Sequence, residues 1–144
     1  MNNHSLSILI GGVAAAILLG ISGVFQKSAQ GISQGPYLIV VGLVIALVGG
    51  VWWWATRASE WSLPAIGYSA LFALFWALAT GCIAIGISRY GGNISQLAPL
   101  YNMNTLVAVL IGLTIMGESK TVHPLPICIG AVLIVAGGIV AARG

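Results

Sequence analysis

The stretch LPAIGYSALFALFWALATGCIAIGI, residues 63–87, runs for 25 residues without a charged side chain. A helix crosses a hydrocarbon layer about 30 Å thick with roughly 20 apolar residues. Four other stretches of the chain match this one in length and apolar character. The sequence therefore predicts five membrane-spanning helices, at residues 6–25, 36–55, 63–87, 94–116 and 124–142.

The composition of the whole chain leads to the same class of protein. Charged side chains make up 5% of the 144 residues, whereas a soluble domain carries about 25%. So few charges cannot cover a globule with a solvated surface, which excludes a soluble enzyme, a nucleic-acid binder and a disordered chain. We expect an all-α integral membrane protein, a single domain of residues 1–144 with the lipid bilayer as partner.

Neither the leader nor the cysteines change this interpretation. The first apolar stretch follows a leader without Lys or Arg and exceeds the usual 7–15 residue core of a signal peptide, so we expect a retained span. Cys82 and Cys128 lie inside apolar runs and show neither metal spacing nor a disulfide pattern. We expect no cofactor and no metal.

The loop charges barely favour one orientation. Short connections make consecutive helices antiparallel, so one side of the membrane would hold Arg57 and Lys120 and the other Lys27, Arg89 and Arg143. The Lys and Arg bias normally sets the topology. Because the two sides are nearly equal, the chain could insert in either orientation or in both. A fixed topology set by other factors is the alternative.

The fourth predicted span is the polar one, because it carries every amide side chain within the five predicted spans: Gln96, Asn102 and Asn104. Pro99 lies among them and predicts a kink, since it removes a backbone donor. The amides either join helices through hydrogen bonds of about 0.6 kcal/mol each or line a substrate path. We favour a substrate path, and predict contacts with Asn102, Tyr101, Gln96, Trp76, Asn104 and Pro99.

Trp76 joins this set because of its depth. It ends an aromatic stripe with Tyr68, Phe72 and Phe75 on the third span. Such a stripe most often faces lipid or the protein core. Trp prefers the membrane interfaces, however, so the mid-membrane Trp76 is the member that we expect to face a cavity.

None of the five predicted spans contains Asp, Glu, His, Lys or Arg. The usual proton relay or ion-coupling site needs such a group inside the membrane, and an intramembrane hydrolase needs a nucleophile, a base or a metal. We therefore do not expect an enzyme.

Small residues at regular steps predict close helix contacts, because apolar helices gain nothing hydrophobic by meeting in lipid. The first span has Gly12, Ala16 and Gly20 at four-residue steps. The last span has Gly130, Gly137 and Gly138. We expect this last group to form a seam with a second copy of the chain, although spacing alone does not identify the neighbour.

The end of the chain resembles a known repeat. Ala98-Pro99-Leu100 is followed by Met116-Gly117-Glu118 and then by the Gly-rich run of residues 129–138. This order resembles the EamA-type repeat of the drug/metabolite transporter superfamily. The resemblance covers all five spans and implies half of a ten-helix fold, in which two oppositely oriented five-helix units enclose a central substrate cavity. We expect a structural role for Glu118.

The chain is also distantly similar to the small multidrug resistance family, but departs from it at both functional positions. Leu19 stands where that family has its proton-coupling Glu, eight residues before Lys27. The Gly-x-Gly of its third helix falls on residues 102–104, which read Asn-Met-Asn. The resemblance therefore does not carry over a proton-driven mechanism.

Together these patterns predict a transporter of small metabolites or drug-like solutes, working by alternating access as an antiparallel homodimer. We expect it in a bacterial-type inner membrane. A chain with one five-helix repeat needs a second copy to supply the inverted half. The alternatives are a proton-coupled multidrug cation exporter and a non-transporting membrane subunit that requires a different partner chain.

Overall fold

The computed structural model describes residues 3–57 and 60–144, and this part of the chain is helical with no strand. Five helical segments are long and apolar enough to cross a membrane: Ser5–Ser28, Gln34–Thr56, Leu63–Ser88, Ile94–Thr114 and Pro124–Ala142. The predicted all-α fold is confirmed, and each of the five predicted spans is a helix long and apolar enough to cross a membrane. Their ends differ from the predicted ends by at most three residues, the largest shift being at Ser28.

The helices of the first unit, Met1–Gly91, include one irregular span. This span starts with α1 (Asn3–Ser7), widens into the π-helix η1 (Ile8–Ala14) and continues as α2 (Ala15–Ser28). The other two are α3 (Gln34–Thr56) and α4 (Leu63–Ser88).

Local sequence explains where α4 begins and where α3 ends. The helix α4 begins with a Pro in its first turn, where no backbone donor is needed. At the end of α3, Arg57 adopts the left-handed conformation and donates its N–H to the carbonyl of Trp53 at 2.8 Å. A left-handed residue of this kind commonly closes a helix.

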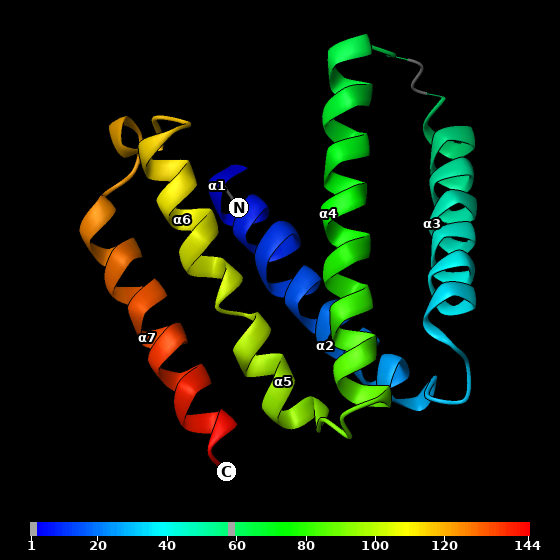
Figure 1. Cartoon of the computed structure of the whole chain (residues 1–144). Coiled ribbons are helices and arrows are strands. Elements are labelled where there is room, and N and C mark those ends of the chain that lie inside the picture. Colours follow the sequence, from blue (N-terminus) through cyan, green and yellow to red (C-terminus); the bar gives the residue numbers. More distant parts are fainter. Residues whose placement is uncertain (1–2, 58–59) are drawn as a thin grey trace. The chain divides into compact units, whose positions relative to one another are not determined.

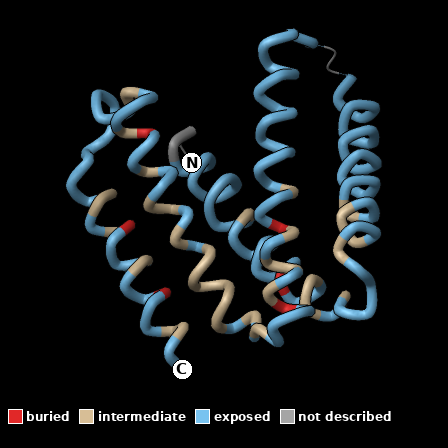
Figure 2. The backbone as a smooth tube through the Cα atoms, in the orientation of Figure 1, coloured by how far each residue is buried: buried red, intermediate tan, exposed pale blue. Residues whose placement is uncertain are grey.

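Packing in the first unit is concentrated near one end of its helices. Gly23 is buried on α2, and Thr80 and Ile87 are buried on α4. Here Gly81 of α4 admits the side chain of Leu38 from α3, whose Cδ1 lies 3.7 Å from where a Cβ of residue 81 would be. The helix α3 has no buried residue along its length. Figure 2 shows the buried positions of α2 and α4 close together.

The second unit, Gly92–Gly144, is built around its last helix. Its elements are α5 (Ile94–Tyr101), α6 (Asn104–Thr114), the 3₁₀ turn η2 (Glu118–Lys120) and α7 (Pro124–Ala142). The helix α7 packs along both α5 and α6 (Figure 1). The turn between α6 and η2 passes through Gly117, whose φ of 72° suits glycine.

The contact between α5 and α7 requires a glycine. A Cβ at residue 138 would lie 2.7 Å from the carbonyl oxygen of Pro99 and 3.2 Å from its carbon. The two backbones therefore meet at Gly138, which is buried. Ala131, two turns earlier on α7, is only 2% exposed. The sequence predicted that Gly138 would meet a second copy, but its neighbour here belongs to the same chain.

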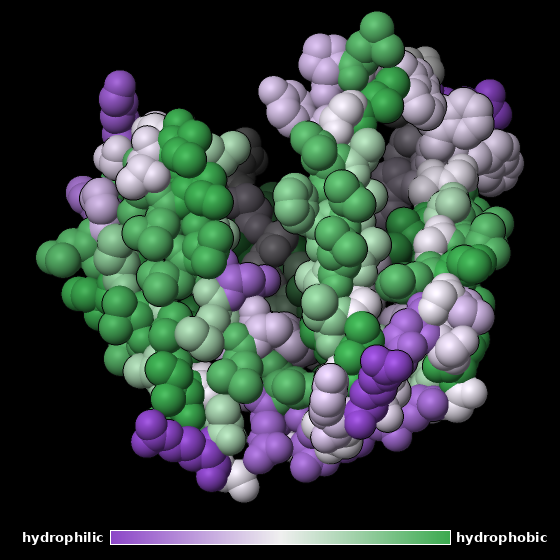
Figure 3. Space-filling view, in the orientation of Figure 1, coloured by the Kyte–Doolittle hydropathy of each residue, from purple (hydrophilic) through white to green (hydrophobic). Residues whose placement is uncertain are grey.

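Most apolar side chains lie on the surface. Among the described residues, Ile87 and Ala131 are the only buried hydrophobic ones. Hydrophobic residues cover the middle of the helices, and polar ones gather nearer their ends (Figure 3). In water such a surface would aggregate, whereas it suits a chain whose solvent is lipid.

Gly138 and Gly137 provide a matched pair of substitutions to test the α5–α7 contact. Gly138→Ala would place its methyl group against the Pro99 backbone, and should destabilise the protein by about 1–3 kcal/mol, as overpacking does. Nothing lies within 4 Å of a Cβ at residue 137. Gly137→Ala should therefore be neutral or stabilising by up to about 1 kcal/mol, from helix propensity.

Thermal unfolding of both variants in the same detergent measures the difference. A melting temperature of Gly138→Ala equal to that of Gly137→Ala would contradict the close contact.

Candidate functional site

The fourth span is broken at its centre. The helix α5 ends at Tyr101, Asn102 and Met103 form a turn, and α6 begins at Asn104. Three backbone hydrogen bonds here reach back three residues instead of four: Met103 to Leu100, Thr105 to Asn102 and Leu106 to Met103. The predicted distortion near Pro99 is present, but the break lies one turn further along the chain.

The break removes helical donors from two carbonyl groups. In an unbroken helix the N–H groups of Met103 and Thr105 would serve the carbonyls of Pro99 and Tyr101. Both N–H groups are instead directed to other carbonyls. The Pro99 oxygen faces the Cα of Gly138, so α7 covers it. The Tyr101 carbonyl is the backbone acceptor at the break that a ligand could use.

Four side chains around the break are polar: Gln96, Tyr101, Asn102 and Asn104. Asn102 and Asn104 are exposed, whereas Gln96, Pro99 and Tyr101 are half-buried. In the part of the chain that the structure describes, neither asparagine makes a side-chain hydrogen bond. The same holds for the Gln96 amide and the Tyr101 hydroxyl. Five of the six predicted contact residues thus lie within residues 96–104, a stretch formed by α5, the turn and the first residue of α6.

Trp76, the sixth predicted contact residue, belongs to α4 in the first unit. It is 37% exposed, which makes it the least exposed of the five tryptophans. Its place in a cavity with the α5–α6 residues stays a prediction.

Glu118 lies against the end of α6. Its Oε2 is 2.8 Å from where a Cβ of residue 112 would be, so the carboxylate covers Gly112, which is buried. Its backbone carbonyl accepts from the N–H groups of Thr121 and Val122, at 2.9 and 3.1 Å. These contacts shape the turn into α7. No cation pairs with the Glu118 carboxylate within residues 3–57 and 60–144.

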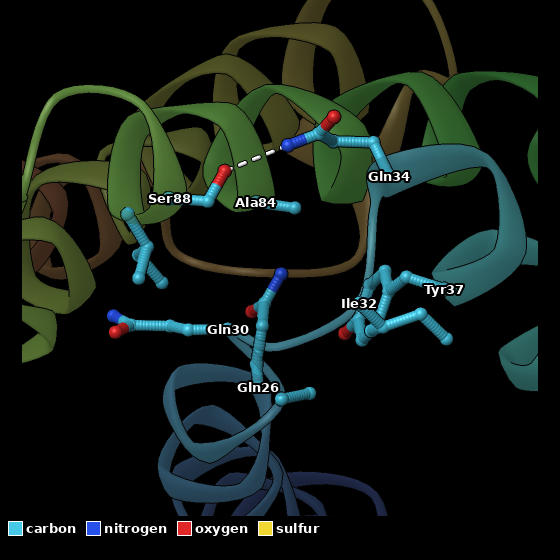
Figure 4. Close-up of a pocket in the computed structure, with 9 residues that line it drawn as sticks. Gln26, Gln30, Ile32, Gln34, Tyr37, Ala84 and Ser88 are labelled. Atoms are coloured by element: carbon cyan, nitrogen blue, oxygen red, sulfur yellow. Dashed lines mark hydrogen bonds between the residues drawn. The ribbon is translucent and has the colours of Figure 1, made fainter.

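A second polar cluster lies in the first unit, and the sequence analysis missed it. Gln26 on α2 donates to the carbonyl of Thr80 on α4 at 3.3 Å. Gln34, at the start of α3, donates to the hydroxyl of Ser88 on α4 at 2.7 Å (Figure 4). These bonds join three helices at the end where they pack. Gln30 and Tyr37 line the same pocket.

The placement of Gln26 and Gln34 corrects one prediction. The fourth span was expected to hold all amide side chains of the spans, but α2 continues to Ser28 and α3 starts at Gln34. Both glutamines are therefore helical. Gln26 and Gln34 lie one and two residues outside the predicted spans 6–25 and 36–55, so a small extension of each helix includes them.

The size of this pocket decides its role. Its volume is about 10 Å³, which is at the lower limit of the roughly 10–15 Å³ that a single water molecule needs. It suits a bridging water rather than a solute. No cluster of His, Cys, Asp and Glu suited to a metal ion occurs among the described residues. The α5–α6 break is therefore the stronger candidate for a substrate site.

Comparison with known protein families, with curated proteins and with solved structures finds no match for this chain. The EamA-type resemblance therefore stays a prediction.

Ser88→Ala tests whether the polar cluster holds the first unit together. It removes the acceptor of the Gln34 amide and should cost about 0.5–1.5 kcal/mol of stability, the net value of a typical hydrogen bond. Ser69→Ala is the matched control, because the Ser69 hydroxyl donates only to Ala65 in its own helix, at 2.8 Å. A lower melting temperature for Ser88→Ala than for Ser69→Ala is expected, and equal values would contradict the role.

Proposed function

We propose that this chain is one protomer of a membrane transporter for a small neutral or zwitterionic solute. The observation that carries the proposal is the break at Asn102–Met103, near the middle of the span Ile94–Thr114. Transporter sites commonly lie near the bilayer midplane, at interrupted helices whose backbone groups contact the solute.

The exposed amides support a substrate site. Inside hydrocarbon every polar group needs a partner, yet Asn102 and Asn104 find none in the described part of the chain. A solute, water or another chain must supply it. Intramembrane polar side chains usually face a cavity or the interior of a bundle.

The chemistry of these groups limits the substrate class. Amides offer both donors and acceptors, the Tyr101 hydroxyl adds one of each, and the Tyr101 carbonyl adds an acceptor. None of them carries a charge. A neutral or zwitterionic solute would be bound through hydrogen bonds and ring stacking, and a strong cation would lack a counter-charge.

Alternating access supports a second copy as partner. Five spans correspond to a single repeat, and the mechanism generally uses two inverted repeats around a midplane site. The loop charges, two cations against three, would allow one sequence to adopt both orientations. We therefore propose an antiparallel homodimer in a bacterial-type inner membrane. Gly130 and Gly137, which have open space around them, are candidates for its seam.

Asn102→Ala should reduce solute flux more than it reduces stability. Proteoliposomes containing only this protein would be loaded with a panel of radiolabelled zwitterionic amino acids and neutral amides. The variant removes a donor and an acceptor, so flux of any transported member should fall at least about tenfold, the effect of about 1.4 kcal/mol. Val132→Ala, on an exposed face of α7, is the control.

Unchanged flux of Asn102→Ala, at matched protein levels, would remove Asn102 from the site. If the parent protein transports nothing in the panel, the alternative of a non-transporting subunit gains support. A steep pH dependence of flux would favour the proton-coupled exporter.

Cysteine labelling tests the dual topology. The native Cys82 and Cys128 are first replaced by Ala, and single cysteines are then introduced at Gln30 or Ser62. Gln30 lies in the loop after the first span and Ser62 in the loop after the second, so the two loops would face opposite sides of the membrane. In a dual-topology population a membrane-impermeant reagent should label about half of each in intact cells, because the loop charges balance. A fixed topology would instead label one completely and protect the other.

A further inference from the structure

The first span contains η1 (Ile8–Ala14), the only π-helix in the described part of the chain. In a π-helix the backbone hydrogen bonds reach back five residues instead of four. Most π-helices are single-turn bulges inside α-helices, and they occur frequently at functional sites. With seven residues, η1 is long for such a bulge. It joins α1 to α2, which lie at the two ends of one helical rod in Figure 1.

Tertiary packing does not hold η1 in the π form. All seven of its residues are exposed. A Cβ added at Gly11 or at Gly12 would have nothing within 4 Å. Uncommon backbone conformations cost energy, and they persist where the surrounding structure enforces them. Because packing does not enforce this one, the π form and the α form of the segment should be close in free energy.

The local sequence permits both forms. Residues 8–14 read Ile-Leu-Ile-Gly-Gly-Val-Ala, with no proline to remove a backbone donor. Leu and Ala favour the α-helix, whereas the pair Gly11–Gly12 weakens it. The exposed pair Gly49–Gly50 in α3 nevertheless remains α-helical. A glycine pair therefore allows the π form without dictating it, which is the behaviour expected of a segment with two accessible states.

The two ends of the first span are held differently. Near the end of α2, Gly23 is buried, and Gln26 donates to the carbonyl of Thr80 on α4 at 3.3 Å. Residues 5–14, in contrast, are all exposed. A change in η1 would therefore leave the end of α2 in place and move α1.

The change from π to α has a defined geometry. Each α-helical residue adds about 1.5 Å of rise and about 100° of turn. A π-helix has more residues in each turn, so it is shorter and less tightly wound. Conversion of η1 to an α-helix would lengthen the span and rotate α1 about the helix axis by roughly 100°, the offset of one residue. Register shifts of this kind in helices take microseconds to milliseconds.

We propose that η1 is a conformational switch, which alternates between the π form and the α form and thereby turns α1 at one end of the first span. Four of the five residues of α1 are polar, so the switch would move polar groups around the helix axis at the edge of the membrane. The inference concerns the first span alone, and does not depend on the proposed solute or on a second copy.

Relaxation-dispersion NMR of the ¹⁵N-labelled protein in lipid nanodiscs tests the switch, because the method detects exchange on this timescale. We expect amide exchange at residues 8–14 and at the adjoining residues 5–7. Residues 16–28 of α2 should show none. Flat dispersion at residues 8–14, or equal dispersion along α2, would overturn the proposal.

A pair of alanine substitutions tests the cause of the exchange. Gly11→Ala combined with Gly12→Ala should shift the balance toward the α form, by up to about fivefold for each alanine, since alanine is the better α-helix former. Gly20→Ala on α2 is the matched control, because a Cβ there also has nothing within 4 Å. It should leave the balance unchanged.

The ratio of the two forms is read from the dispersion populations and from the ¹³Cα chemical shifts of residues 8–14. An unchanged ratio in the double variant, or an equal change in the control, would overturn the switch. None of these measurements uses flux, so a failure of transport leaves their outcomes unchanged.

Discussion

Because hydrocarbon offers the peptide backbone no hydrogen-bond partner, each N–H and C=O group of an apolar chain must find one within the chain. Continuous helices satisfy this need along almost the whole length of the described residues. The helices end where other groups or water take over, at Pro, at Gly and at charged side chains. Arg57 closes α3 in this way, and Gly117 turns the chain after α6.

The fourth span is the exception, because its helix is broken between α5 and α6. The neighbouring helix α7 packs against both parts. The N–H of Met103 donates to the carbonyl of Leu100 and not to that of Pro99. The Pro99 carbonyl therefore lacks its helical donor, and its oxygen lies 2.7 Å from where a Cβ of residue 138 would be. Gly138 thus supports the break by allowing the Pro99 backbone to approach closely.

Sequence patterns predicted the spans well because length and apolar composition alone define them. They predicted a distortion near Pro99, since a missing N–H has a local effect. The break lies at Asn102 and Met103, one turn beyond the proline. No side-chain cap marks the start of α6, so the sequence pattern did not locate the break. The partner of Gly138 was not predictable, because spacing identifies a face that permits close contact without identifying the helix that fills it.

Two exposed regions of the described chain, the second half of α3 and the break between α5 and α6, require different partners. Along the second half of α3 every exposed side chain from Leu43 to Val51 is apolar or glycine, and apolar helices gain nothing hydrophobic by leaving lipid for protein. Acyl chains satisfy such a surface. At Asn102 and Asn104 the exposed groups are amides, which acyl chains cannot satisfy. Both regions are exposed in the structure, but their side chains differ. The face of α3 suits lipid, whereas the amides at the break require a polar partner.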